Sequence, residues 1–246
     1  MRKYRLDQLL VKRDLADTRS QAENFIKLGV VEVNKKVVTK PGYFVALDAH
    51  INLKAFERYV SRAGLKLASA NFEFEVDFTG ATVLDVGSST GGFTDYALQN
   101  NAKKVIAVDV GSNQLHASLR LDKRIELHEQ TDIREFIDRQ QEKLRTESID
   151  IVVIDVSFIS LRHILPSIAR VCNDTTRVFA MLKPQFEAEA STKHKGIIKN
   201  ERVRRNILKD FEEWVHSYFV VLDKTDSTIH GSKGNIERFY LLKKVG

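Results

Sequence analysis

The sequence predicts an α/β protein with an open, mostly parallel sheet, preceded by a small α+β domain. Two observations predict the sheet: apolar strand-like runs alternate with helical patterns from residue 81 onward, and several of these runs end in an acidic residue. A third observation sets the N-terminal part aside, because there two short helical patterns precede short strands. We place the small domain at residues 1–54, a linker at 55–62 and the α/β domain at 63–246.

The small domain is expected to contain two helices and a hairpin. Leucines recur at helical spacing in the first helix, and the second opens with a capping-box pattern and stops at a glycine. The predicted elements are helices over residues 4–12 and 18–29, hairpin strands over 30–33 and 37–38 around a turn at 34–36, and a strand over 51–53.

The α/β domain is expected to alternate strands and helices. Its predicted strands cover residues 81–86, 104–109, 124–128, 149–156, 176–182, 219–222 and 239–243. Its predicted helices cover residues 65–74, 93–99 and 203–216. The charged, turn-like segment 187–199 is predicted to be a mobile loop near the site.

The most informative segment is a glycine turn between a buried strand and a helix start. It reads Asp85-Val-Gly-Ser-Ser-Thr-Gly-Gly-Phe93. The dinucleotide fingerprint G-x-G-x-x-G differs, because here an acid lies two residues before the first glycine, whereas a pyrophosphate requires bare amides. A carboxylate suits a cationic ligand such as S-adenosylmethionine, although a strand-turn-helix without a ligand stays an alternative. The candidate ligands in this turn are Asp85, Gly87, Ser88, Gly91, Gly92 and Phe93.

Three further acids follow strands of the predicted sheet, at the edge where open α/β sheets bind ligands. Asp109 ends the second strand, about twenty residues after the turn, where a ribose-binding carboxylate is expected. Asp132 follows the third strand, so it either reaches an adenine amino group or caps a helix. Asp155 ends the fourth strand and is included among the cofactor-binding candidates.

Composition restricts the class of protein. Residues 1–62 contain 13 Lys and Arg against 7 Asp and Glu, so the whole formal charge of +6 lies in this segment. A basic module joined to a neutral one suits contact with a nucleic acid. The single cysteine, Cys172, excludes an intrachain disulfide and a cysteine-built metal site, and we expect no metal. Because no apolar run approaches the roughly 20 residues that span a bilayer, we expect a cytoplasmic protein without a membrane partner.

If the cofactor is S-adenosylmethionine, the residues after the fourth strand indicate the acceptor atom. They read Asp155-Val-Ser-Phe, without the prolyl-aromatic tetrapeptide that holds an exocyclic nitrogen. Carbon-five methylation of a pyrimidine needs a cysteine nucleophile, but Cys172 lies in a helical segment well past this strand. A hydroxyl acceptor fits best, and it must lose its proton to a base as it attacks. The candidates for this chemistry are Lys66, Asp155, Lys183 and Glu237.

The N-terminal segment resembles the alpha-L RNA-binding module of a small-subunit ribosomal protein and of pseudouridine synthases. The similar strings are Arg5-Leu-Asp-Gln-Leu-Leu, Thr18-Arg-Ser-Gln-Ala and Ile26-Lys-Leu-Gly-Val-Val-Glu-Val-Asn34. The resemblance implies that Arg5, Arg19, Ser20 and Lys27 lie near an RNA backbone. For Arg19, pairing with a neighbouring acid is the alternative.

Residues 60–244 resemble the FtsJ-type ribose methyltransferases, and the order of domains is similar to that of the hemolysin A (TlyA) family. The similar strings include Val60-Ser-Arg-Ala-Gly-Leu-Lys66, Lys183-Pro-Gln-Phe-Glu187 and Gly231-Ser-Lys-Gly-Asn-Ile-Glu237. The resemblance implies a cytidine 2'-O-methyltransferase of ribosomal RNA with a Lys-Asp-Lys-Glu tetrad: Lys66, Asp155, Lys183 and Glu237. We expect Lys183 to be the base or to orient the hydroxyl, the two acids to position the lysines, and Lys66 to add a cation. Ala63 and Leu65 depart from the family pattern, which affects local packing more than chemistry.

Three other functions are alternatives: a small-molecule O-methyltransferase, a membrane-active haemolysin, and an RNA-binding ribosome-assembly protein without turnover. The basic N-terminal module disfavours the first, and the lack of a long apolar run disfavours the second. The acids and the tetrad candidates disfavour the third. The modified nucleotide, the ribosomal subunit and the oligomeric state, monomer or homodimer, stay open.

Overall fold

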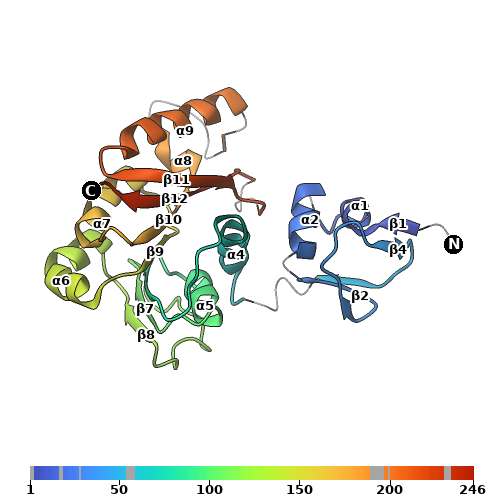
Figure 1. Cartoon of the computed structure of the whole chain (residues 1–246), viewed down its shortest axis with the longest axis horizontal. Helices are drawn as coiled ribbons and strands as arrows, with labels where there is room; N and C mark the ends of the chain where they lie inside the picture. Colours follow the sequence, from blue (N-terminus) through green and yellow to red (C-terminus); the bar gives the residue numbers. More distant parts are fainter. Residues whose placement is uncertain are drawn as a thin grey trace.

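A seven-stranded sheet forms the centre of the larger domain in the computed structural model, which describes residues 3–16, 19–27, 29–53, 59–188, 197–198, 200–229 and 234–246 (Figure 1). Its strands are β6 (Thr82–Val86), β7 (Lys104–Val108), β8 (Ile125–His128), β9 (Ile151–Ile154), β10 (Arg177–Leu182), β11 (Phe219–Asp226) and β12 (Arg238–Lys244). The strand order is β11-β12-β10-β9-β6-β7-β8, and every pair from β10 to β8 is parallel. The predicted α/β fold with a mostly parallel sheet is confirmed.

Helices cover both faces of this sheet. They are α4 (Arg62–Phe74), α5 (Gly92–Gln99), α6 (Ile133–Glu147), the 3-10 helix η1 (Leu161–His163), α7 (Leu165–Val171), α8 (Pro184–Glu187) and α9 (Glu201–Val215). Alternate residues of β6 point to opposite faces, so Val83 packs in one core with α4 and α5, and Leu84 packs in the other with α6, α7 and α9. Both cores are apolar because both faces of a parallel sheet are buried.

The strand order reverses between β6 and β9, which are parallel neighbours. Helix α5 follows β6 on one face, and α7 follows β9 on the other. The chain therefore diverges beyond the carboxyl ends of these two strands and leaves a crevice there. This crevice is where the sequence places its acidic candidates.

The N-terminal domain contains two small sheets and two helices. Its elements are β1 (Lys3–Arg5), α1 (Leu6–Lys12), α2 (Arg19–Lys27), β2 (Val31–Val33), β3 (Lys36–Val37), β4 (Phe44–Ala46) and β5 (Ile51–Leu53). The predicted hairpin and third strand form the sheet β3-β2-β5, and positive φ angles of 51° and 65° at Asn34 and Lys35 make the two-residue turn.

The predicted start of the first helix was wrong. Tyr4 and Arg5 belong to β1, which pairs in antiparallel fashion with β4, a strand that the sequence did not indicate. A long-range strand partner thus overrides the helical spacing of the leucines at this end.

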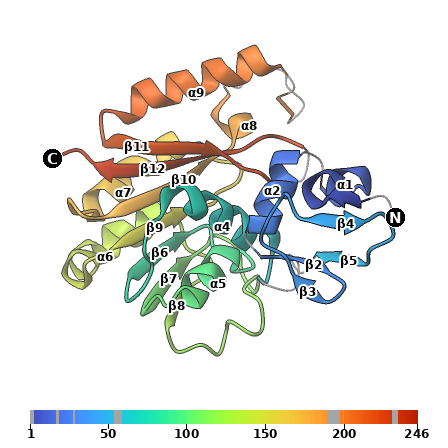
Figure 2. The ribbon, with the colours of Figure 1, turned by 45° about the vertical axis from the view of Figure 1, so that its right-hand side comes forward.

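Helix α4 lies between the two domains (Figures 1 and 2). The ammonium of Lys27 on α2 lies 5.7 Å from the ring centre of Phe72 on α4, which joins the domains by a cation–π contact. The predicted linker is described only from Tyr59 onward. Of the loop predicted to be mobile, residues 189–196 and 199 lie outside the described residues.

Candidate active site

The first glycine of the turn brings two strand ends together. Gly87 has a φ of +82°, and a Cβ atom added to it would lie 2.6 Å from the carbonyl oxygen of Asp155. A side chain is excluded both by the backbone conformation and by this close approach. Gly87 therefore allows β6 to end directly against the end of β9, at the switch point.

The other two glycines serve the packing of α5. Gly91 is the N-cap of this helix, with a φ of +90°. A Cβ atom on Gly92 would lie 2.8 Å from both the Cβ of Ala63 and the backbone nitrogen of Gly64, at the start of α4. The two helix N-termini thus meet in backbone contact. Phe93 lies in the core, with its ring centre 6.1 Å from that of Phe239.

Asp85 is completely buried at the end of β6. Its Oδ2 accepts a hydrogen bond of 2.6 Å from the hydroxyl of Thr94. Burial raises the pKa of Asp85 to about 7, and the negative charges of Asp155 and Asp109 act in the same direction. A carboxylate in this setting would be stabilised by a ligand that brings a positive charge.

Three buried polar atoms around the turn lack a hydrogen-bond partner among the described residues: Asp85 Oδ1, Ser88 Oγ and Ser61 Oγ. Buried polar groups are normally paired, so these atoms indicate a ligand with both donors and acceptors. The ammonium and carboxylate of the methionine part of S-adenosylmethionine meet that requirement. Ser61 was missed from the sequence, although it stands directly before the first turn of α4.

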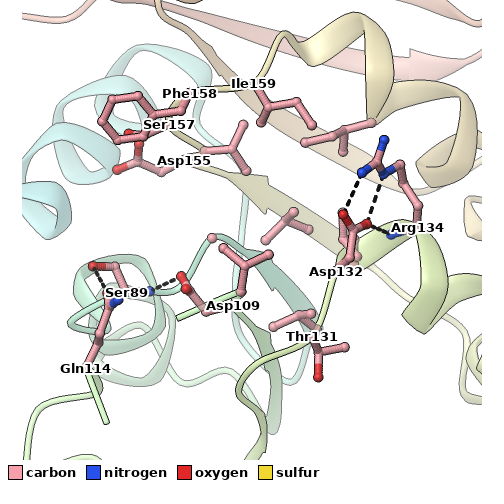
Figure 3. A pocket seen from close by; sticks show the side chains of 17 residues that line it. Ser89, Asp109, Gln114, Thr131, Asp132, Arg134, Asp155, Ser157, Phe158 and Ile159 are labelled. Atoms are coloured by element: carbon pink, nitrogen blue, oxygen red, sulfur yellow. Dashed lines mark hydrogen bonds and ion pairs between the residues drawn. The ribbon is translucent and has the colours of Figure 1, made fainter. Parts of the chain in front are cut away.

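A pocket continues from the turn along the sheet edge (Figure 3). Asp109 organises its floor, because one carboxylate oxygen accepts from the Ser89 nitrogen at 2.8 Å and the other from the Gly111 nitrogen at 2.6 Å. The apolar part of the wall comes from Val86, Val108, Val110, Ile133, Val156, Ile159 and Ile164. Apolar walls with a few fixed polar groups suit an adenosine.

Asp132 also lines this pocket, and it caps α6. Its carboxylate accepts from the backbone nitrogen of Arg134 at 2.8 Å and pairs with the Arg134 guanidinium at 2.6 Å (Figure 3). The capping alternative is therefore present in the structure. Contact of Asp132 with an adenine amino group stays a prediction.

The four tetrad candidates lie at the same edge of the sheet as two ion pairs. Lys183 Nζ lies 2.7 Å from Asp155 Oδ1 and donates a hydrogen bond of 2.8 Å to Ser157 Oγ. Lys66 on α4 pairs with Glu237, and both of these side chains are almost buried. Asp155 also lines the pocket, so one pair borders the cofactor space directly.

The sheet register explains why these residues meet. Leu182 and Arg238 are paired at the ends of β10 and β12. Lys183 is the next residue after β10, and Glu237 is the last residue before β12. Each therefore lies one step beyond the same register pair. Because β12 runs antiparallel to β10, Glu237 lies beside Lys183 in the register of the two strands.

The pocket has an aromatic border that the sequence analysis did not select. Phe158 is 91% exposed, has a positive φ of 65° and lies with its ring centre 5.1 Å from that of Phe186. A strained backbone holding a bulky apolar side chain in solvent is characteristic of functional sites.

The predicted RNA contacts lie on β1 and α2. Arg5 and Arg19 both pair with the buried carboxylate of Asp7, at 2.7 and 3.0 Å, and Arg19 also pairs with Glu23. The alternative considered for Arg19, pairing with a neighbouring acid, is thus present. The Ser20 side chain lies outside what the structure describes.

The sheet is doubly wound and has an acid-lined pocket at its switch point, and two lysine–carboxylate pairs lie at the same edge of the sheet. These features define the class of protein as a Rossmann-like methyltransferase. Comparison with known proteins then gives the family. The chain belongs to the FtsJ-like methyltransferases, whose family model matches residues 59–244, and an S4 domain model matches residues 5–51. The predicted cofactor, S-adenosylmethionine, is confirmed by this membership.

Relatives match along almost the whole chain. The chain is 42% identical to a Bacillus subtilis protein named "Putative rRNA methyltransferase YqxC", over 96% of this chain and 84% of the relative. It is 32% identical to the "16S/23S rRNA (cytidine-2'-O)-methyltransferase TlyA" of Mycobacterium tuberculosis, over 98% and 90%. A solved structure described as a "putative hemolysin" from Streptococcus thermophilus is 39% identical, with a TM-score of 0.71, over 100% and 90% of the two chains. Among the described residues no helix is both long and apolar enough to cross a membrane.

Proposed function

We propose that this protein transfers a methyl group from S-adenosylmethionine to the ribose 2'-hydroxyl of a cytidine in ribosomal RNA. The observation that supports it most is the Lys183–Asp155 pair at the border of the cofactor pocket, backed by the pair Lys66–Glu237. The relatives named as ribosomal RNA methyltransferases and the S4 domain favour the same substrate. The proposed site of action is the cytoplasm, where the ribosomal RNA named as substrate of the bacterial relatives is assembled.

Different pocket residues would bind different parts of the cofactor. The buried Asp85 carboxylate would hold the ammonium group, and Ser61 and Ser88, whose hydroxyls lack a partner among the described residues, would hydrogen-bond the methionine end. Asp109 would accept hydrogen bonds from the ribose hydroxyls, and Asp132 would accept from the adenine amino group. S-adenosylmethionine supplies, when bound, a methyl group made electrophilic by the sulfonium.

The tetrad prepares the acceptor. An alcohol must lose its proton as it attacks, so a group at hydrogen-bond distance has to orient the hydroxyl or accept that proton. Lys183 Nζ, held in place by Asp155 and Ser157, orients the hydroxyl or, as the neutral amine, accepts its proton. Glu237 positions Lys66, which adds a second cation near the developing alkoxide.

Chemistry at a base carbon through a cysteine is disfavoured. Cys172 is the only cysteine in the sequence, and it lies buried at the C-terminal end of α7, away from the described pocket. Burial raises its pKa to about 12, which suppresses the thiolate that such a mechanism requires.

The decisive experiment compares Lys183→Ala with Lys209→Ala, a control lysine exposed on α9. The purified full-length chain is given radiolabelled S-adenosylmethionine and ribosomal subunits, and 2'-O-methyl positions are mapped. We expect Lys183→Ala to lose roughly 100- to 10,000-fold in kcat with unchanged cofactor binding, and the control to match the parent. An unchanged rate in Lys183→Ala would refute the base assignment. RNA binding without any methyl transfer by the parent would favour the assembly-factor alternative.

The proposed domain division follows the predicted boundaries, 1–54 for RNA binding, 55–62 for the linker and 63–246 for methyl transfer. In this division the charged module binds RNA and the neutral domain performs the chemistry.

A further inference from the structure

In the N-terminal domain, a segment of five residues, 43–47, contains three exposed large apolar side chains. Tyr43 is 50% exposed, Phe44 58% and Leu47 47%. Exposed apolar residues that occur singly need no explanation, but a group of them marks an interaction surface. We call Tyr43 and Phe44, on the turn into β4, the aromatic pair.

The backbone under the aromatic pair is fixed. The carbonyl of Tyr43 accepts a hydrogen bond of 2.8 Å from the Leu6 nitrogen, and the carbonyl of Pro41 accepts one of 3.2 Å from the Asp7 nitrogen. These two amides belong to the first turn of α1 and have no partner inside the helix. Phe44 is in addition paired with Arg5 across β4 and β1. The rings are thus held on a preorganised backbone.

Cationic side chains lie beside this surface, and Asp48 is the exposed acid next to Leu47. The guanidinium of Arg5 lies beside the turn, 3.5 Å from where a Cβ atom on Gly42 would be. The fully buried Asp7 fixes both Arg5 and Arg19, and hydrogen bonds from these arginines keep the pKa of Asp7 near 2 despite its burial. Lys3 and Lys40 are exposed nearby on β1 and before the turn. Aromatic rings among cations match a single-stranded nucleic acid better than an apolar protein surface.

We propose that the aromatic pair stacks on unpaired bases of the RNA, while Arg5 and Arg19 bind the adjoining phosphates. This proposal rests on RNA being the substrate and specifies which form of RNA the N-terminal domain recognises. Only unpaired bases expose their faces to stacking, so the preferred partner is a loop or bulge rather than a duplex. β1 and β4 lie at the end of the small domain that is farther from the seven-stranded sheet (Figure 1). The RNA segment bound there is therefore separate from the methylated nucleotide.

The test uses the full chain, a fluorescent single-stranded 12-nucleotide RNA and a 12-base-pair RNA duplex. The double variant Tyr43→Ala/Phe44→Ala is compared with Val220→Ala/Leu222→Ala, which removes two apolar side chains, each 44% exposed, from the edge strand β11. We expect the aromatic variant to bind the single strand at least about 10-fold more weakly and the duplex nearly normally, with an unchanged salt slope. Arg5→Ala should instead lower the salt slope by about one for both RNAs.

Equal loss of affinity for single strand and duplex, or no loss at all, would overturn the proposal. So would a loss for intact ribosomal subunits without a loss for RNA alone, since the rings would then contact a ribosomal protein. Tyr43→Trp/Phe44→Trp should restore binding, which a purely structural role would not predict. Methyl transfer at saturating RNA is measured in parallel: failure of the proposed function appears as absent transfer in the parent, whereas failure of this inference leaves transfer intact.

Discussion

Replacement of Asp85 by asparagine should stabilise the protein without cofactor and weaken cofactor binding. In the folded chain burial raises the pKa of Asp85 from 3.8 to about 7. Asparagine has nearly the same shape, can accept the hydrogen bond from Thr94 and never becomes charged. The two effects have opposite signs because the buried charge destabilises the free fold and is needed by a cationic ligand.

The size of the stability effect follows from the two pKa values. Below about pH 4 the carboxyl is protonated in both states and contributes nothing. Between pH 4 and 7 the folded chain retains a proton that the unfolded chain releases, so stability falls as pH rises. Above pH 7 the cost reaches at most about 4 kcal/mol, the free-energy equivalent of the difference between about 7 and 3.8. Asp85→Asn should regain at most that amount.

Thermal unfolding at pH 5 and pH 8 measures the stability effect, and calorimetric titration with S-adenosylmethionine measures the affinity. We expect the melting temperature of Asp85→Asn to exceed the parent's by on the order of 10 °C at pH 8 and by less at pH 5. Cofactor affinity should fall roughly 10- to 100-fold, as for loss of a hydrogen bond to a charged group. Asp77→Asn, at an exposed position, is the control. A gain that does not grow with pH, or unchanged cofactor affinity, would refute the reasoning.

Three further changes test other parts of the site. Gly87→Ala places a methyl group 2.6 Å from the Asp155 carbonyl at a positive φ, so we expect about 1–2 kcal/mol or more of lost stability by calorimetry, together with weaker cofactor binding. Arg204→Met leaves Asp226, whose side chain is 40% exposed, with Arg238 as its remaining partner, and frees the carbonyl of Ile236, directly before Glu237. We expect about 1–3 kcal/mol of lost stability in denaturant titration and a larger loss in kcat than in KM, partly rescued by Arg204→Lys. Cys172→Ala should leave kcat unchanged in the methyl-transfer assay, and a dead variant would point to a cysteine mechanism.

The sequence predicted the sheet well because its evidence is local. Buried parallel strands are short apolar runs in the sequence. The carboxyl ends of parallel strands lie at one edge of the sheet, so the acids that follow these runs could be placed together at that edge. The glycine turn was equally readable, since Gly87 has a conformation that other residues rarely adopt.

Interactions between distant segments were harder to predict. β1 depends on pairing with β4, about forty residues later, so the leucine spacing alone gave a helix that began too early. Asp132 satisfied both a ligand pattern and a capping pattern, and the sequence could not choose between them. Phe158 became noticeable only through its exposure and its positive φ, neither of which a sequence pattern shows.

The pairing within the tetrad shows the same limit most clearly. Glu187 lies four residues after Lys183 and, judged by spacing alone, is as good a partner for that lysine as Asp155. In the structure Glu187 instead accepts from the Ser160 hydroxyl at 2.5 Å and the Leu161 nitrogen at 2.7 Å, which fixes the segment that follows β9. Lys183 is left to pair with Asp155, and the register of β10 with β12 brings Glu237 to the same edge, where it pairs with Lys66. Short sequence motifs thus identify the four residues of the tetrad, whereas the strand order and register of the sheet determine which of them pair.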